Sequence, residues 1–343
     1  MITIVAWIVV LGVLVAVHEL GHFLVAKGFS MRVDEYSLGF GRSLWKRRWG
    51  ETLYAVRMIP LGGYVRLGGM DGERRDDPRD FPNRPLGQRF LVILAGPVMN
   101  VLLAVILYAV AFGPVGQPVP TTTVAHTLAG YPAARAGIRP GDRIVSVDGH
   151  PIRDWTNLQK TLQHHARQRI AVGVERGHHL HHLSLTTRYD RQVKAWLIGI
   201  QPAMRAVHLG LLRAVGRGAM DTARLAGAWF GAMVHLLEGH GPSVEGPVGI
   251  AVQVRIAANL GFYYLVLLSA ALSLNLGLFN ILPFPVLDGS RLVLIGLEGV
   301  RKKALNPNHE GLIHLAGMVI LLLMVVLVTF HDVASLVRAR GSS

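Results

Sequence analysis

The sequence predicts a membrane protein, mainly an α-helical four-span bundle with a cytoplasmic loop that contains β-hairpins and an external α+β domain. Of its 343 residues, 51% are hydrophobic and 16% are charged, whereas about a quarter of the residues of a soluble protein are charged. Four stretches contain roughly the 20 apolar residues that a helix needs to cross a bilayer. The formal net charge of +14 lies mainly on one side of these stretches.

The predicted spans are residues 2–26, 90–112, 262–284 and 312–330. Lys and Arg concentrate in residues 27–89 and 285–311, whereas only Arg255, Arg338 and Arg340 lie close to the opposite span ends. Short cytoplasmic loops carry this excess of basic residues. We therefore expect a multi-pass protein of the inner cell membrane, with the N-terminus outside and 27–89 and 285–311 in the cytoplasm. Because topology and the lipid bilayer explain the positive charge, we expect no nucleic-acid partner.

Residues 206–238 have a helical apolar pattern that is interrupted by Arg213, Arg217, Asp221 and Arg224. This pattern favours one or two amphipathic helices at the membrane surface, and a fifth span is the alternative. The expected organisation is a first membrane half with two spans (1–113), the external domain (114–200), the surface helices (201–261) and a second membrane half (262–343).

The first span contains the sequence His18-Glu19-Leu20-Gly21-His22. Residues four apart share one face of a helix, so both imidazoles can bind one metal ion, with the intervening Glu19 as general base. Polar residues buried in helix packing are the alternative, but ionisable groups inside a span are costly and are usually functional. The chain has no cysteine, so other ligands must be imidazole or carboxylate.

A catalytic zinc site usually has three protein ligands, and Asp288 is the candidate for the third. It directly follows the third span, and with four spans it lies on the same side of the membrane as His22. A fifth span at 206–238 would place it on the opposite side. The alternative for Asp288 is a turn-forming role before Gly289.

These motifs resemble the site-2 protease family of intramembrane zinc metalloproteases, in particular the bacterial regulator-of-sigma-E-protease-like branch, which cleaves anti-sigma factors. The similar segments are His18 to His22, Gly39-Phe40-Gly41, Pro60-Leu61-Gly62-Gly63-Tyr64, Ala95-Gly96-Pro97-Val98-Met99-Asn100, Asn280-Ile281-Leu282-Pro283 and Leu287-Asp288-Gly289.

The resemblance implies Zn²⁺ held by His18, His22 and Asp288, with Glu19 as the base. It also implies that Asn280 and Pro283 help to hold an unwound transmembrane substrate. That substrate is expected to be anti-sigma-factor-like and to be cleaved after a first trimming cut. For Asn100, a hydrogen bond to neighbouring helices and a contact with substrate remain equal alternatives.

The external segment shows short β-type runs at Arg143–Val147, 170–175 and 182–186, and a helical run at 157–163. It resembles a single PDZ domain, which captures extended peptides or free C-termini; a purely steric barrier over the active site is the alternative. The histidines at 164, 165, 178, 179, 181 and 182 form a cluster. Those at 178–182 fit a solvated hairpin end, so we do not assign the cluster a metal.

Residues 33–69 alternate in polarity and contain many glycines, which predicts hairpins that approach the site and could pair with an extended substrate. A simple cytoplasmic loop cap is the alternative. Residues 70–84 are expected to be a flexible linker. Two other functions use the same features: a membrane metal transporter or sensor that employs these histidines, and a membrane-anchored PDZ scaffold without catalysis.

Overall fold

The computed structural model describes residues 2–70, 77–191, 193–238, 246–303 and 307–341. The chain divides into two compact units. The first comprises Met1–Val115 and Leu209–Ser343, and the second is Gly116–His208. The predicted linker at 70–84 lies partly outside the described residues.

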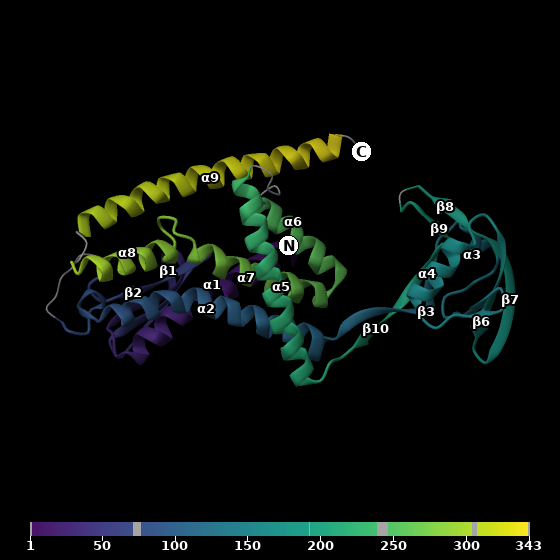
Figure 1. The fold of residues 1–343 in the computed structure, drawn as a ribbon, viewed down its shortest axis with the longest axis horizontal. Helices are drawn as coiled ribbons and strands as arrows, with labels where there is room; N and C mark the ends of the chain where they lie inside the picture. Colours follow the sequence, from purple (N-terminus) through teal and green to yellow (C-terminus); the bar gives the residue numbers. More distant parts are fainter. Residues whose placement is uncertain (1, 71–76, 192, 239–245, 304–306, 342–343) are drawn as a thin grey trace. The chain divides into compact units, whose positions relative to one another are not determined.

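Among the described residues of the first unit, three helices are long and apolar enough to cross a membrane (Figure 1): α1 (Ile2–Gly28), α2 (Leu86–Val110) and α7 (Phe262–Ile281). Helix α2 packs against both α1 and α7. On α1, the side chains of Val5, Val9 and Val13 are 58%, 55% and 48% exposed and lie four residues apart. Such a stripe of exposed valines is suited to contact with lipid chains rather than water.

The first three predicted spans correspond to these helices, with differences at their ends. Helix α2 begins at Leu86 instead of residue 90, and α7 ends at Ile281 instead of residue 284. The earlier end of α7 follows from Pro283, because a proline disfavours helical geometry in the residue before it and cannot donate a backbone hydrogen bond.

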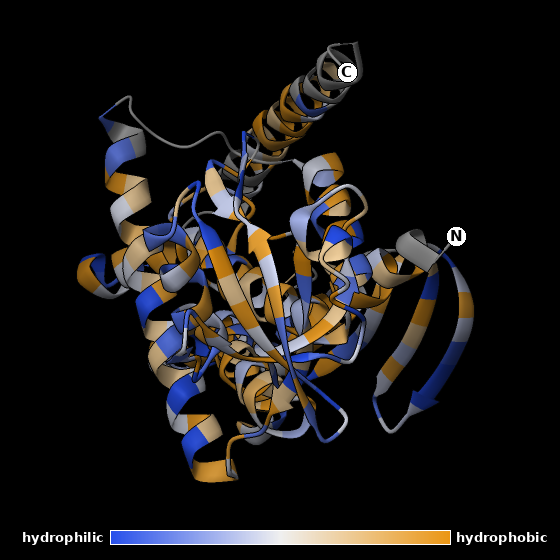
Figure 2. Cartoon of the chain, turned by 90° about the vertical axis from the view of Figure 1, so that its right-hand side faces the viewer, coloured by the Kyte–Doolittle hydropathy of each residue, from blue (hydrophilic) through white to orange (hydrophobic). Residues whose placement is uncertain are grey.

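The fourth predicted span lies within α9 (Pro307–Gly341), whose apolar stretch is Leu315–Phe330. Hydrophobic residues run along much of this helix (Figure 2). The stretch is shorter than those of the three long apolar helices, so the four-span count stays a prediction. Asp332 of α9 accepts hydrogen bonds from the amides of Gly246 and Gly249, at 3.1 and 2.8 Å. It thereby caps the N-terminus of α6 (Pro247–Leu260).

Within residues 206–238, where surface helices and a fifth span are the alternatives, the chain forms one continuous helix, α5 (Leu211–Leu237). This helix crosses α2 at a steep angle (Figure 1). It is not among the three membrane-span candidates found in the described residues. Its contact with α2 is close, because a Cβ atom on Gly218 would lie 2.8 Å from the carbonyl oxygen of Val105. On the helix, Arg217 Nε donates to Asp221 Oδ2 at 2.8 Å, so part of the charge within this helix is paired.

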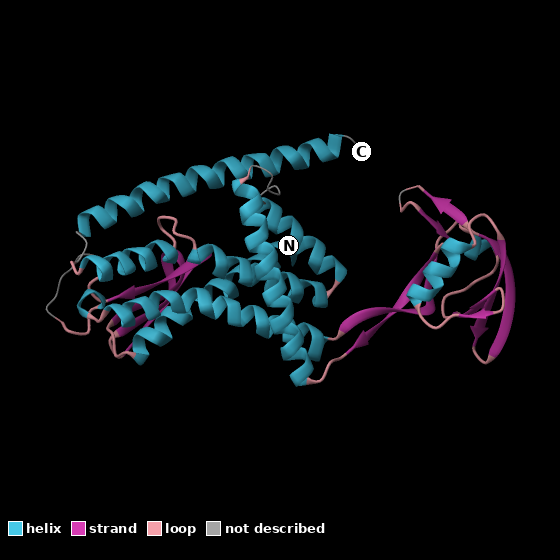
Figure 3. Cartoon of the chain, in the orientation of Figure 1, coloured by secondary structure: helices cyan, strands magenta, loops and turns pink. Residues whose placement is uncertain are grey.

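Strands β1 (Val33–Trp49) and β2 (Thr52–Leu67) form the predicted hairpin structure (Figure 3). Residues 33–38 pair with 63–67 and also with 53–56, while 43–49 pair with 52–57. Both strands therefore bend back on themselves. In β1 the bend falls at Gly39 and Gly41, whose φ angles of +88° and +82° favour glycine.

Helix α8 (Asp288–Arg301) begins directly after the loop that follows α7. The carboxylate of Glu298 in α8 accepts a hydrogen bond from Arg89 Nη2 of α2 at 2.5 Å. Arg89 itself is only 8% exposed, and charge-assisted hydrogen bonds of this kind are stronger than neutral ones. The pair thus fixes α8 against the beginning of α2.

The second unit is an α+β structure built around one six-stranded sheet in the order β10-β3-β4-β6-β7, with β5 beside β4. Its elements are β3 (Gln117–Thr127), α3 (Pro132–Arg135), β4 (Arg143–Val147), β5 (His150–Pro151), α4 (Trp155–His164), β6 (Arg169–Arg176), β7 (His179–Thr186), β8 (Arg188–Asp190), β9 (Ala195–Leu197) and β10 (Ile200–Val207). Its core contains Ile144, Leu158 and Ile170, all nearly inaccessible to solvent.

The three predicted strands and the helix of this unit are present as β4, β6, β7 and α4. Asp154 caps α4 by accepting from the Asn157 amide at 2.7 Å. The unit ends at His208, later than the expected boundary at residue 200, because β10 pairs with β3 along its length.

Candidate active site

Helix α1 places His18 and His22 on one face, one turn apart. Both side chains are buried, and each residue is 7% exposed. The Nε2 atoms of the two rings are 3.2 Å apart. The local period of the helix therefore brings two potential ligand atoms to one point inside an apolar bundle.

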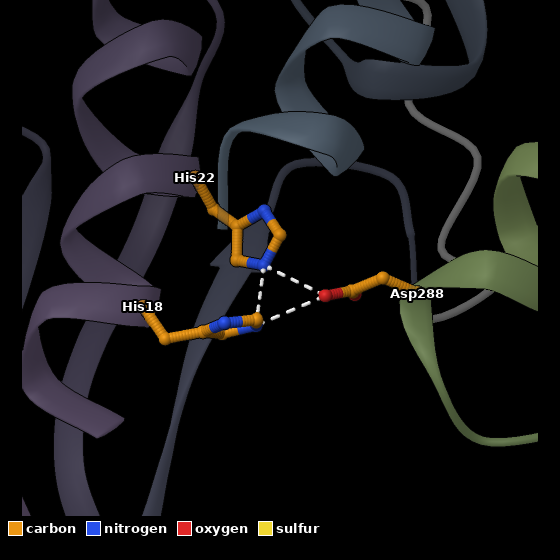
Figure 4. Close-up of side chains that lie close together, drawn as sticks. All are labelled: His18, His22 and Asp288. Atoms are coloured by element: carbon orange, nitrogen blue, oxygen red, sulfur yellow. Dashed lines mark hydrogen bonds and ion pairs between the residues drawn. The ribbon is translucent and has the colours of Figure 1, made fainter. Parts of the chain in front are cut away.

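Asp288, the first residue of α8, completes this cluster (Figure 4). Its Oδ2 atom lies 2.9 Å from His18 Nε2 and 3.4 Å from His22 Nε2. Among the described residues, these three form the one group of at least three His, Asp or Glu side chains whose ligand atoms could share a metal ion. The three side chains come from two helices and point toward one another.

The separations of the ligand atoms fit zinc. Tetrahedral zinc with bonds of about 2.0–2.2 Å places neighbouring ligand atoms roughly 3.3–3.6 Å apart. The two separations from His22 Nε2, 3.2 and 3.4 Å, lie close to this range, whereas His18 Nε2 and Asp288 Oδ2, 2.9 Å apart, are at hydrogen-bond distance. Two imidazoles and one carboxylate are also a ligand set found in catalytic zinc sites, which leave one position open.

Close backbone approach makes room for the cluster. A Cβ atom on Gly96 of α2 would lie 2.3 Å from His22 Nε2 and 2.8 Å from His18 Nε2. A Cβ atom on Gly289 would lie 2.1 Å from the carbonyl oxygen of Ile281. Glycine is therefore required next to Asp288, where the start of α8 passes against the end of α7.

Glu19 lines the same cavity as the three cluster residues, and the cavity has a volume of about 380 Å³. Strand β2 passes directly over this side chain, since a Cβ atom on Gly63 would be 3.2 Å from Glu19 Cγ. The hairpin is anchored to α1 by the Tyr36 hydroxyl, which donates to the carbonyl of Ala16 at 3.0 Å. Glu19 thus lies between the ligand cluster and a strand of the loop.

The two predicted substrate-binding residues have different positions. Asn280, near the end of α7, lines the cavity, whereas Pro283 is exposed and is not part of the cavity lining. Val286, between Pro283 and Asp288, lines the cavity with a φ angle of +82°. A β-branched residue in this region is strained, and strain of this kind is held in place by surrounding contacts.

A charged cluster stabilises the hairpin beside the cavity. Glu35 Oε1 accepts hydrogen bonds from Arg57 Nη2 at 2.6 Å and from the Tyr64 hydroxyl at 2.8 Å. Burial alone would raise the pKa of Glu35, but these hydrogen bonds and the nearby charges of Arg57 and Arg66 lower it below its ordinary value. Because Tyr64 also lines the cavity, the cluster links β1 to the cavity wall.

A His-Glu-x-x-His helix, an aspartate beside both histidines and an adjacent cavity inside a bundle of apolar helices are the features of a metalloprotease site in a membrane protein. The model of peptidase family M50 matches residues 6–324, and the chain belongs to this family. The resemblance to the site-2 proteases is thereby confirmed.

Relatives over nearly the whole length agree with this assignment. A protein of Clostridium acetobutylicum is 31% identical over 328 residues, covering 95% of this chain and 96% of that protein. The zinc metalloprotease RasP of Geobacillus kaustophilus is 27% identical, covering 96% and 97%. The regulator of sigma-W protease RasP of Bacillus subtilis is 26% identical, covering 97% and 99%. This chain is a zinc metalloprotease, and its cofactor is Zn²⁺.

Among solved structures, a PDZ domain from Listeria innocua is similar to part of the chain. It has 20% sequence identity and a TM-score of 0.23, and the match covers 26% of this chain and 99% of that one.

The sequence singled out His18, Glu19, His22, Asp288 and Asn280, and the structure brings all five to one cavity. Sequence reasoning placed Gly96 in a family-like segment but assigned it no role at the site, although a glycine inside an apolar helix is itself a signal of close packing. It also missed the backbone carbonyl of Val92, which accepts a hydrogen bond from His22 Nδ1 at 2.8 Å. No sequence pattern reveals such a contact, because every residue has a carbonyl group.

Proposed function

We propose that this protease hydrolyses peptide bonds within or near the transmembrane helices of membrane-bound substrates, with His18, His22 and Asp288 as zinc ligands and Glu19 as general base. The observation that carries the proposal is the convergence of these three ligands with Glu19 on one cavity among apolar helices. The transporter or sensor alternative is not favoured, because the described residues offer one compact ligand cluster rather than several along a path.

His18, His22 and Asp288 would hold the zinc ion, which would polarise the scissile carbonyl and make the attacking water more acidic. Glu19 accepts a proton from the attacking water as the new carbon–oxygen bond forms. It then passes this proton to the leaving nitrogen as the carbon–nitrogen bond breaks. His18, His22 and Asp288 keep their positions throughout, because helix packing and hydrogen bonds orient them.

A substrate helix must unwind before attack, since its amides are hydrogen-bonded within the helix. Freed backbone groups inside a membrane require new partners. The Asn280 side chain lines the cavity and offers both a donor and an acceptor. The segment of β2 at Gly62 to Tyr64 borders the same cavity and can pair with an extended chain. Pro283, which is exposed, would act on the substrate outside this cavity.

The substrate we propose is an anti-sigma-factor-like regulator that has one membrane span and has already lost its outer domain. The name of the Bacillus subtilis relative, regulator of sigma-W protease, supports this class. The second unit would be an external PDZ-like domain that binds peptide C-termini or excludes untrimmed substrates. This arrangement places residues 27–89 and 285–311 in the cytoplasm, in line with their excess of Lys and Arg.

The test uses the full chain in proteoliposomes with a tagged single-span substrate of this class. Glu19→Gln keeps the side-chain size but cannot accept the proton, so cleavage should fall by roughly 10²–10⁴-fold. Zinc content should stay at one ion per chain, because Glu19 is not a ligand, and uncut substrate should co-purify.

Near-normal cleavage by Glu19→Gln would refute the proposed mechanism, and loss of zinc would make Glu19 a ligand instead. Measuring zinc uptake into the same proteoliposomes distinguishes the transporter alternative from the protease. Flux that is independent of any cleavage would support transport, whereas cleavage without flux supports the protease.

A further inference from the structure

Asn100 of α2 is completely buried next to the ligand His18. Its Nδ2 atom lies 3.3 Å from His18 Nδ1. Its Oδ1 atom is buried and has no hydrogen-bond partner among the described residues. A buried acceptor without a partner is costly, so this atom requires an explanation. Asn100 does not line the cavity, so a direct contact with substrate does not provide one.

The hydrogen bonds of His18 depend on which ring nitrogen carries the proton. With Nδ2 of Asn100 donating, His18 Nδ1 accepts and the ring proton is on Nε2. There it faces Asp288 Oδ2 at 2.9 Å and His22 Nε2 at 3.2 Å. In this arrangement the proton lies among the three ligand atoms, where a metal ion would bind.

Metal binding through Nε2 requires the other neutral tautomer, with the proton on Nδ1. That proton then needs an acceptor. Turning the Asn100 carboxamide by 180° about its Cβ–Cγ bond exchanges the positions of Oδ1 and Nδ2, and the group occupies nearly the same space in both orientations. His18 Nδ1 would then donate to Oδ1, so the buried acceptor would gain a partner, and the Nδ2 group would take the position that Oδ1 now occupies.

For the other ligand histidine, His22, the neighbouring acceptor already determines which ring nitrogen carries the proton. His22 Nδ1 lies 2.8 Å from the carbonyl oxygen of Val92, which can only accept. The His22 proton is therefore on Nδ1, and Nε2 is free to bind metal. Metal-binding histidines in general donate their second N–H to a carbonyl or carboxylate. Among the described residues, the Asn100 side chain is the one hydrogen-bond partner of His18 Nδ1.

The backbone that carries Asn100 is held firmly. Its carbonyl accepts from Ser273 Oγ of α7 at 2.8 Å. A Cβ atom on Gly277 would lie 2.9 Å from the carbonyl oxygen of Pro97 and 3.2 Å from Asn100 Cβ, so α2 and α7 are in close contact here. The carboxamide can therefore turn over without moving away from His18.

We propose that Asn100 is a positioning residue for zinc, whose carboxamide turns Oδ1 toward His18 and holds this histidine in the tautomer that binds metal through Nε2. The inference rests on the proposed zinc site. Of the two roles that the sequence leaves open for Asn100, a hydrogen bond to a neighbouring helix and a contact with substrate, this proposal corresponds to the first.

The experiment measures zinc affinity of the purified full chain by competition with a chelator, with Co²⁺ absorption as a second readout of ligand geometry. Asn100→Leu keeps the size but removes the acceptor, and should raise the Kd for zinc by about 10–100-fold. Asn100→Asp keeps an acceptor at the same place and should stay within a few-fold of the wild type, with a similar Co²⁺ spectrum.

Thr222→Val is the matched control, because Thr222 of α5 is 4% exposed and its hydroxyl is buried without a partner among the described residues. It should leave zinc affinity unchanged. Wild-type affinity in Asn100→Leu would overturn the inference, as would equal losses in Asn100→Leu and Asn100→Asp. If Asn100→Leu does not fold, Asn100→Ala replaces it against the same Asp variant. A wild-type chain without stoichiometric zinc would instead refute the proposed function.

Discussion

The substitution Gly96→Ala tests whether close approach of α2 shapes the metal site. The new methyl carbon would lie 2.3 Å from His22 Nε2 and 2.8 Å from His18 Nε2, whereas ordinary contacts begin at 3.4 Å. His22 Nε2 must therefore move by about 1.1 Å and His18 Nε2 by about 0.6 Å, or α2 must retreat by a similar amount. Zinc–nitrogen bonds have lengths of about 2.0–2.1 Å, so a shift of this size separates the ligands from a common ion.

We expect Gly96→Ala to raise the Kd for zinc by more than about 100-fold, beyond the 10–100-fold effect typical of residues that only support ligands. The helix itself should not suffer, since alanine is about 1 kcal/mol more favourable than glycine inside a helix. Zinc affinity by chelator competition and thermal unfolding of the metal-free chain separate the two effects. Gly87→Ala is the control in the same helix, because a Cβ atom there meets nothing within 4 Å. Wild-type zinc affinity in Gly96→Ala would refute the steric argument.

Three further predictions concern other parts of the chain. Asp288→Asn should lose zinc while α8 still forms, and full retention in a metal analysis would place the third ligand elsewhere. A reporter fused after Lys303 should be cytoplasmic and one fused at Gly149 external; an external signal at Lys303 would contradict the topology. Glu35 has a lowered pKa, so its contribution to stability is complete above its ordinary value and is lost as pH falls through the folded-state pKa. The difference in melting temperature between wild type and Glu35→Gln should therefore shrink below pH 4.5, and a difference that stays constant from pH 6 to 3.5 would contradict this.

Local patterns predicted much of the fold. The three long apolar helices follow from hydropathy, and the strands of the second unit follow from short β-type runs, because both signals arise within a few residues. The doubled pairing of β1 and β2 could not be predicted in this way. Residues 33–38 pair on both sides, with 63–67 and with 53–56, and a strand's alternation of polarity does not identify its partners.

The grouping of the candidate site residues was predictable where chemistry requires a fixed number of ligands. The spacing of His18 and His22 reflects the helical period, and two histidines leave a catalytic zinc site short of a third ligand, for which Asp288 was the candidate. The loop before Asp288 was not predictable, because its course depends on tertiary contacts. Val286 adopts a φ angle of +82° that nothing in its side chain favours.

The contribution of α2 to the site explains why a helix without any zinc ligand should control zinc affinity. Val92, Gly96 and Asn100 are spaced by four residues and therefore share one face of α2. Along this face, Val92 accepts from His22, Gly96 leaves room for both Nε2 atoms, and Asn100 contacts His18. The order is the reverse of that in α1, so the two helices run antiparallel with their four-residue periods in register. A slip of α2 by one residue would turn this face by about 100° and would remove all three contacts together. The proposed ligands are therefore carried by α1 and α8, but on this proposal their tautomers and spacing depend on how α2 packs against α1.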